Sequence, residues 1–440
     1  MEHCLRAVGL AEGRYACEAV ADLLTDALAC AALLPAAPGG DREADRAELL
    51  GRLLRAQLRA GRVTAARETR RTAVERAVAA CREDLEVHAF TAWSEPTPWR
   101  TRPYGVVDRP VVERLERLLE RPGREPGVRA RLLGAYAAEL SDAKVPAVRA
   151  AAREALALAG EQADPVLRAG ALATLAKELD ADLEWRERAA LGAELEWLGA
   201  AHDLPAHRRY GMFVRSTALA AEGDAEGAHG LVRRWTELAR AYRMPGPTAV
   251  AETAAATLAH VEGRFEEAEA RYRRSAERMA RQGSPHAQGS LAIATAALWA
   301  AQGRLARSVP WARRVYAGFG PVAADLLAAA LAAAGEDGEA RRLPAEAGPL
   351  RTDYLFKVLG TFRATALVAL GERDGAARLY GALLPYRDAP PVSPGFTVAV
   401  RPVAGTLGEL AALLGREAEA AAHRARAREI AERWRCPWGS

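Results

Sequence analysis

Hydrophobic residues recur at helical spacing along most of the chain, and glycines interrupt this pattern at regular intervals. At each interruption a glycine is followed by Arg, Asp or Glu and, shortly afterwards, by Ala. The motif occurs at Gly61, Gly223, Gly263, Gly303, Gly335, Gly371 and Gly415. Its later copies are 40, 40, 32, 36 and 44 residues apart. A glycine in the left-handed conformation ends a helix, so each copy predicts a turn between two helices.

Small residues stand at two fixed distances from these glycines. Five residues after each glycine come Ala66, Ala228, Ala268, Ser308, Ala340, Ala376 and Ala420. Seven residues before each come Leu54, Ser216, Ala256, Ala296, Ala328, Ala364 and Gly408, of which all but Leu54 are small. Small side chains let two helices approach closely, so we expect the two helices of each hairpin to touch at these positions. A weaker eighth copy begins at Gly13, with Glu18 where a small residue is expected.

Helical hairpins that repeat at this period stack into a solenoid. The sequence therefore predicts an all-α fold, a tetratricopeptide-like right-handed superhelical solenoid of helical hairpins. The expected helix pairs are 207–222 with 225–243, 247–262 with 265–282, 286–302 with 305–318, 322–334 with 337–345, 350–370 with 373–386, and 397–414 with 417–434. We divide the chain into N-terminal helical repeats (1–90), a Trp/Pro-rich loop (91–107), degenerate hairpins (108–205) and tetratricopeptide-like repeats (206–440).

Prolines mark the segments that cannot be helical. They are dense in 88–107 and in 388–395, and a shorter cluster lies in 35–41. A proline inside a helix removes a hydrogen bond and clashes with the preceding turn. All three segments are therefore predicted to be loops.

The charge of the chain is nearly balanced, with 61 basic and 57 acidic residues interleaved along the predicted helices. Interleaved charge is typical of solvated helix faces, and no clustered basic stripe is present, so direct nucleic-acid binding is not expected. Almost all basic residues are arginine, which together with abundant alanine indicates a GC-rich bacterial genome. The five cysteines lack paired spacing and no leading apolar run is long enough for a membrane, which predicts a cytoplasmic protein with reduced thiols.

Motifs for the common cofactor and metal chemistries are missing. The sequence holds no P-loop, no glycine-rich dinucleotide fingerprint, no His-Glu-x-x-His pattern, no paired-cysteine zinc pattern and no nucleophile elbow. His202 and His207 are five residues apart, but they flank a helix start, where histidine more often caps the backbone. We therefore expect no cofactor and no metal.

Candidate binding residues follow from the geometry of a solenoid, which binds along the concave face formed by the first helix of each pair. Counting back from each turn glycine selects residues that are mildly polar. Ordinary helix packing is the alternative for every one of them. The candidates are Tyr210, Thr217, Thr253, Thr257, His260, Asp325, Thr361 and Glu409.

The Trp/Pro-rich loop is the second candidate. It carries two tryptophans, two arginines and a tyrosine between Trp93 and Tyr104. Such an element must dock on the solenoid to be ordered. It is expected either to dock only, or to wall one end of a pocket with Trp99 while Arg100 or Arg102 meets an anionic ligand.

Parts of the chain resemble a known family. Residues 96–105, 128–133, 377–386 and 405–438 are similar to the C-terminal tetratricopeptide-repeat region of large bacterial transcriptional regulators, of the antibiotic-regulatory and LuxR/MalT-like types. In those regulators this region senses a ligand or partner, whereas an NTPase module and a DNA-binding module do the rest. Neither module is recognisable here, so the resemblance implies the sensing part alone.

Two functions are compatible with these observations. The first is a regulatory or binding solenoid of specialised metabolism that holds a small-molecule effector, a peptide or a partner protein on its concave face. The alternative is an enzyme of specialised metabolism in which His260, Asp325 and Tyr210 perform acid–base or cyclisation chemistry in the superhelix cavity. The lack of a catalytic motif favours the binding protein. The sequence is compatible with a homodimer and leaves open the ligand and whether the chain is a complete protein or a fragment.

Overall fold

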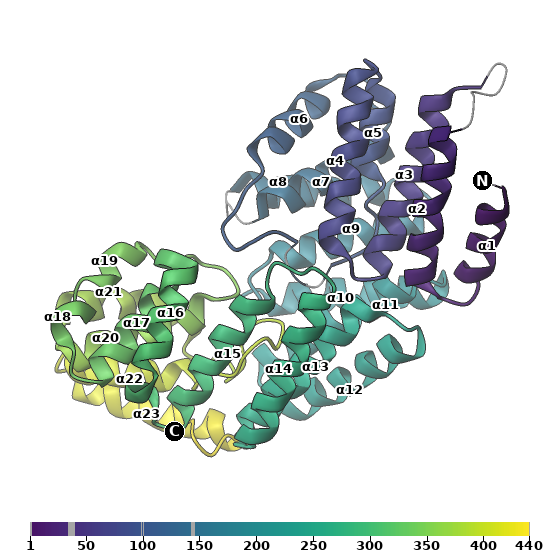
Figure 1. The fold of residues 1–440 in the computed structure, drawn as a ribbon. Coiled ribbons are helices and arrows are strands. Elements are labelled where there is room, and N and C mark those ends of the chain that lie inside the picture. The colour runs from purple at the N-terminus through teal and green to yellow at the C-terminus, as the bar shows by residue number, and fades with distance from the viewer. Residues whose placement is uncertain (1, 34–39, 98, 100, 142–145, 440) are drawn as a thin grey trace.

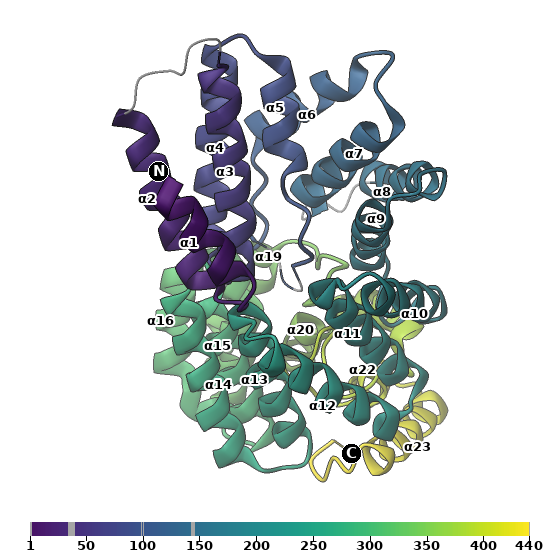
Figure 2. The ribbon, with the colours of Figure 1, turned by 90° about the vertical axis from the view of Figure 1, so that its right-hand side faces the viewer.

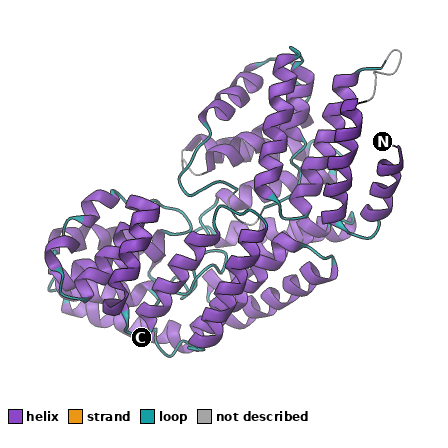
Figure 3. Cartoon of the chain, in the orientation of Figure 1, coloured by secondary structure: helices purple, strands orange, loops and turns teal. Residues whose placement is uncertain are grey.

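The computed structural model describes residues 2–33, 40–97, 99, 101–141 and 146–439. The described residues form α-helices joined by turns, short 3-10 helices and loops, and none of them belongs to a named strand (Figure 3). One isolated antiparallel bridge joins Val392 and Ala399. The predicted all-α class is confirmed.

The first nine helices form the upper part of the molecule in Figure 1, coloured purple to blue. Most consecutive helices pack against each other, as a hairpin solenoid requires. Their bounds are α1 (Glu2–Glu12), α2 (Cys17–Leu33), α3 (Arg42–Arg59), α4 (Val63–Ala79), α5 (Glu83–Thr91), α6 (Arg109–Glu120), α7 (Pro126–Leu140), α8 (Pro146–Gly160) and α9 (Pro165–Glu178).

The remaining helices form the lower part, coloured teal to yellow. They are α10 (Trp185–Ala201), α11 (Pro205–Glu222), α12 (Ala225–Ala241), α13 (Pro245–Val261), α14 (Phe265–Arg281), α15 (Ala287–Ala301), α16 (Val309–Phe319), α17 (Ala324–Ala333), α18 (Asp337–Ala340), α19 (Leu343–Ala347), α20 (Phe356–Leu370), α21 (Arg373–Leu383), α22 (Val403–Leu413) and α23 (Glu417–Arg433). Most bounds lie within two residues of those predicted.

The predicted turns and helix contacts are confirmed. All seven turn glycines have positive φ, from 65° at Gly303 to 96° at Gly223. The seven small residues that follow them by five positions are all 0% exposed, and Ser216 and the four alanines seven positions before a turn glycine are 0% exposed too. At the weaker eighth copy the left-handed residue is Tyr15, with φ of 52°, instead of Gly13.

Proline and glycine explain where the helices differ from the prediction. The helix expected from 350 begins only at Phe356, after Gly348 and Pro349, and the helix expected from 397 begins after Pro402. The second helix of one pair, expected over 337–345, is split into α18 and α19. By contrast, α5 is longer than expected. It continues to Thr91, so the loop expected from residue 88 begins later. The loop predicted at 35–41 lies largely outside the described residues.

The stretch Leu305–Ala333 is the part of the described chain that is long and apolar enough to cross a membrane, and 56% of its most apolar window is buried inside the protein. The structure divides it into a 3-10 turn, α16, a second 3-10 turn at Gly320–Ala323, and α17. Nearly every residue of α17 is buried among the neighbouring helices. The α17 part of the stretch thus has the environment of a core helix.

The C-terminal end packs back onto earlier repeats. The ring of Trp434 lies 5.7 Å from that of His229 on α12, and the ring of Trp438 stacks on His260 of α13 at 5.0 Å. Trp434 also shares one hydrophobic core with Trp235. The repeats from α11 to α23 therefore close on themselves, with the yellow C-terminal end beside the teal helices in Figure 2.

Candidate functional site

Residues 92–108, which we call the crossing segment, dock on the inner side of the N-terminal helices. Arg102 is 5% exposed and donates to the carboxylate and the backbone carbonyl of Glu139. Arg70 donates to the same carboxylate at 2.5 Å. Lys177 of α9 donates to the carbonyl oxygens of Thr97 and Trp99 at 3.0 and 3.2 Å. Docking of the segment is thus achieved by buried charged groups that meet carboxylate or carbonyl oxygens.

Residues 388–402, which we call the inner loop, lie inside the C-terminal repeats. The loop is closed by backbone hydrogen bonds between Ser393 and Val398 and from Val400 to Pro391. Phe396 is 1% exposed, and its carbonyl accepts a hydrogen bond of 2.8 Å from Thr257 on α13. Val398 and Val400 pack in one core with residues of α13, α15, α17 and α20. The chain thus fills much of its own concave face.

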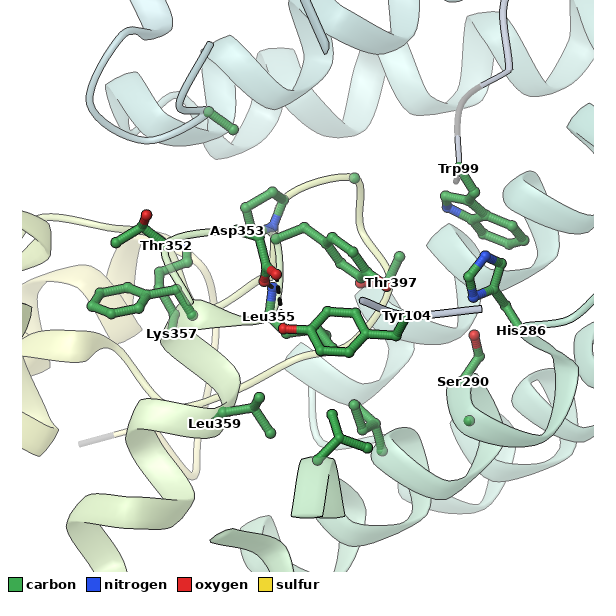
Figure 4. A pocket seen from close by; sticks show the side chains of 18 of the residues that line it. Trp99, Tyr104, His286, Ser290, Thr352, Asp353, Leu355, Lys357, Leu359 and Thr397 are labelled. Atoms are coloured by element: carbon green, nitrogen blue, oxygen red, sulfur yellow. Dashed lines mark hydrogen bonds between the residues drawn. The ribbon is translucent and has the colours of Figure 1, made fainter. Parts of the chain in front are cut away.

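A cavity of about 410 Å³ lies between the crossing segment and the inner loop. It falls within the volume range of small-molecule sites. Figure 4 shows a close view of its wall. The lining residues come from the crossing segment (Trp99, Pro103, Tyr104), the α9–α10 connection (179–182), α11 (Tyr210, Phe213), α15 (289–293), the end of α16, the connection to α20 (352–355) and the inner loop (Pro394, Gly395, Thr397).

Aromatic side chains make up much of this wall. Tyr210 and Phe213 stack on α11 with ring centroids 5.8 Å apart. Tyr104 meets Tyr354 edge to face at 6.0 Å. Phe319, at the end of α16, is 39% exposed although it lines the cavity. Such a surface favours a ligand with a flat apolar body.

Two tyrosine hydroxyls on the wall donate to carboxylates from distant parts of the chain. Tyr104 Oη donates to Asp353 at 2.7 Å, the dashed contact in Figure 4, and Tyr386 Oη donates to Asp180 at 2.7 Å. Burial, and next the neighbouring carboxylate, raises the pKa of each tyrosine. Both hydroxyls therefore stay protonated. The guanidinium of Arg351 stacks over the Tyr104 ring at 4.6 Å.

A buried ion pair forms another part of the wall. Lys357 Nζ lies 2.9 Å from Asp182 and donates to the carbonyl of Val392 at 3.0 Å. The two side chains are 2% and 8% exposed. Burial raises the pKa of Asp182, whereas Lys357 opposes that rise. Through this pair α20 holds both the α9–α10 connection and the inner loop.

The predicted site residues are distributed differently from the expected groove. Trp99 and Tyr210 line the cavity. Arg102 meets Glu139 of the protein itself, and Arg100 lies outside the described residues. Thr217 accepts a hydrogen bond of 3.1 Å from Arg188.

The remaining candidates lie in helix packing or in internal pairs. Thr253 bonds to Ser275 at 2.6 Å, and Thr257 bonds to Tyr272 and to the inner loop. Thr361 donates to a carbonyl of its own helix. Asp325 accepts two hydrogen bonds from Arg363, and Glu409 pairs with Arg401.

His260 is buried completely, and the desolvation lowers its pKa to about 3. Both of its ring nitrogens lack a hydrogen-bond partner among the described residues. Of the three residues considered for catalysis, only Tyr210 is among those that line the cavity; His260 and Asp325 are not. The described residues also contain no group of three or more His, Cys, Asp or Glu side chains that is placed to hold a metal ion.

Sequence reasoning missed most of the polar wall, namely Asp180, Asp182, Asp353, Lys357 and Tyr386. One signal was available. The chain has three lysines, and two of them, Lys177 and Lys357, line the cavity. In a chain whose positive charge is otherwise arginine, the rare lysines mark the site.

Comparison with known proteins adds a structural likeness and no likeness to a family model or a curated protein. No model of a known protein family matches the chain, and no curated protein matches it. A solved structure, the crystal structure of a Rap protein complexed with competence and sporulation factor, is similar over 89% of this chain and 98% of its own, with 12% identity and a TM-score of 0.49. At this level the likeness says nothing about what the chain binds.

Proposed function

We propose that this chain is a helical-repeat binding protein that holds a small organic molecule in the cavity between the crossing segment and the inner loop. The observation that carries the proposal is the cavity of about 410 Å³. Its mixture of aromatic walls and a few placed polar groups is typical of small-molecule sites.

The inner loop favours a small molecule over a peptide or a partner protein. An extended peptide would need the concave face of the first helices, which the inner loop already contacts at Thr257 and Phe213. Phe396 and Ala399 of the loop are 1% and 0% exposed. Displacing such a loop would expose a large apolar area.

A regulatory role suits the position of the cavity. On its wall, Tyr104 donates a hydrogen bond to Asp353, although the two residues are 249 positions apart in the sequence. A ligand that contacts both sides favours the arrangement in which this bond is formed, and can thereby alter the surface offered to a partner. This is the behaviour expected of the sensing region of a bacterial transcriptional regulator, the family that the sequence resembles.

Native mass spectrometry of the gently purified protein tests the proposal, because a cavity ligand would be retained and its mass measured. Gly289→Met places a long side chain on α15 at the wall, where the new Cβ meets Phe319 at 3.5 Å, an ordinary contact. Gly381→Met is the matched control, since it adds the same side chain to an exposed helix position with nothing within 4 Å.

We expect the small molecule to be retained by wild type and by Gly381→Met and to be lost from Gly289→Met. Retention of the same molecule by Gly289→Met would place it elsewhere. Retention of a peptide or protein in place of a small molecule would contradict the proposal.

A further inference from the structure

The charges on the cavity wall limit what can be held there. We infer that the ligand is uncharged at neutral pH, with a flat apolar body and few polar groups. This inference rests on the proposed function, because it describes the ligand of the same cavity.

The wall carries equal numbers of opposite charges. Three basic and three acidic side chains are among the described residues that line it: Lys177, Arg188, Lys357, Asp180, Asp182 and Asp353. Each is already engaged by another group of the protein. The charged groups of the wall therefore have partners within the protein before any ligand enters.

Two of the carboxylates have a basic side chain against them. Asp182 is paired with Lys357 at 2.9 Å, and Asp353 is paired with Arg351 at 3.2 Å. Asp353 also accepts the hydroxyl of Tyr104. A cationic ligand would have to compete with a cation that is already in place.

The third carboxylate is engaged by hydrogen bonds. Asp180 accepts from the Tyr386 hydroxyl at 2.7 Å and from the backbone N–H groups of Asp182 and Leu183 at 2.9 and 3.0 Å. Three donors use most of the acceptor capacity of a carboxylate and fix its orientation.

The other two basic side chains are directed to backbone oxygens. Lys177 donates to the carbonyls of Thr97 and Trp99. Arg188 donates to the carbonyls of Ala176 and Leu179 and to the Thr217 hydroxyl. An anionic ligand would have to replace these contacts, which hold the crossing segment and the end of α9.

A charged ligand would lose its hydration on entering this cavity without gaining a counter-charge, which is costly. An uncharged aromatic molecule gains the contacts of Trp99, Tyr104, Phe213 and Phe319 without that loss. The hydroxyl oxygens of Tyr104 and Tyr386 keep acceptor capacity for a ligand O–H or N–H.

A matched set of probes tests this inference. The probes are 2-naphthalenemethanol, 2-naphthoate and 2-naphthylmethylammonium, which share one ring system and are respectively neutral, anionic and cationic. Binding is measured by calorimetry at pH 8.

We expect the neutral probe to bind at least about tenfold more tightly than either ion, a difference of about 1.4 kcal/mol. Equal or tighter binding of either ion would overturn the inference and leave the proposed function standing. Failure of all three probes to bind would count against the proposed function, and with it the inference.

Variants of the buried pair extend the test. Asp182→Asn leaves Lys357 without its counter-charge and should shift the preference at least tenfold toward 2-naphthoate; Lys357→Met should shift it toward the ammonium probe. The double variant removes both charges of the pair. It should again prefer 2-naphthalenemethanol, even if the protein is less stable. Glu252→Gln removes a carboxylate that pairs with Arg278 away from the cavity, and should leave the order of the probes unchanged. An unchanged order in both single variants, with the proteins folded, would contradict the inference.

Discussion

Closure of the C-terminal repeats by the last helix predicts a large cost for removing Trp434. This side chain is 2% exposed and packs in one core with Trp235 and against His229. A buried tryptophan removes roughly 150–250 Å² from water, and at about 25 cal/mol per Å² this corresponds to about 4–6 kcal/mol. Alanine keeps a small part of that contribution. We therefore expect Trp434→Ala to lower the free energy of unfolding by about 3–5 kcal/mol.

Trp197→Ala is the matched control, because Trp197 is 64% exposed on α10. We expect it to change the free energy of unfolding by less than about 0.5 kcal/mol. Urea titration followed by circular dichroism at 222 nm measures both variants. A cost below about 1 kcal/mol for Trp434→Ala, or equal costs for the two, would show that closure does not stabilise the repeats.

Four further substitutions probe other parts of the structure. Lys357→Met should lower the free energy of unfolding by about 3–5 kcal/mol at pH 8, because it leaves the buried carboxylate of Asp182 unpaired. Since burial raises the pKa of Asp182, that carboxylate takes up a proton as the pH falls. Urea titrations at pH 8 and pH 5 should therefore show a smaller loss at pH 5. His260 keeps its ring neutral down to about pH 3 in the folded protein, whereas an unfolded histidine gains a proton below about pH 6.5. The free energy of unfolding should therefore fall by about 2 kcal/mol between pH 6.5 and pH 5. A His260→Phe variant should lack that part of the pH dependence. Gly303→Ala should lower the free energy of unfolding by about 1–2 kcal/mol, for its left-handed backbone alone. Gly263→Ala should lower it more, because the new Cβ would lie 3.0 Å from Pro437. Equal urea midpoints for the two variants would contradict that contact.

The hairpins were predictable because their signal is local. A left-handed glycine and two small residues at fixed distances specify one turn and one helix contact, whichever way the rest of the chain folds. Helix starts near Gly348 and Pro402 were misplaced where glycine and proline override an apolar pattern. The cavity was not predictable in the same way, since it depends on pairs such as Tyr104 with Asp353 that are 249 residues apart.

The assumption of an open concave face explains why the site candidates were scattered. Counting back from the turn glycines correctly selects the first helix of each pair. However, Thr257 of that helix α13, and Tyr272 of its partner α14, contact the inner loop in place of solvent. Nothing in the sequence of residues 388–402 states where the loop packs. The two cavity lysines were visible in the sequence, and they became informative only with the contacts of Lys357.

The two non-helical segments close the cavity and so limit the size of the ligand. The helices supply another part of the wall, including Tyr210, Phe213 and Phe319. The inner loop supplies bulk there, and its Gly395 has φ of 79° with a Cβ position only 3.3 Å from the Phe213 ring. Any other residue at 395 would press on that wall and strain the backbone. Changes confined to residues 92–108 and 388–402 should therefore alter which molecule fits, because these segments close a cavity whose remaining wall the helices provide.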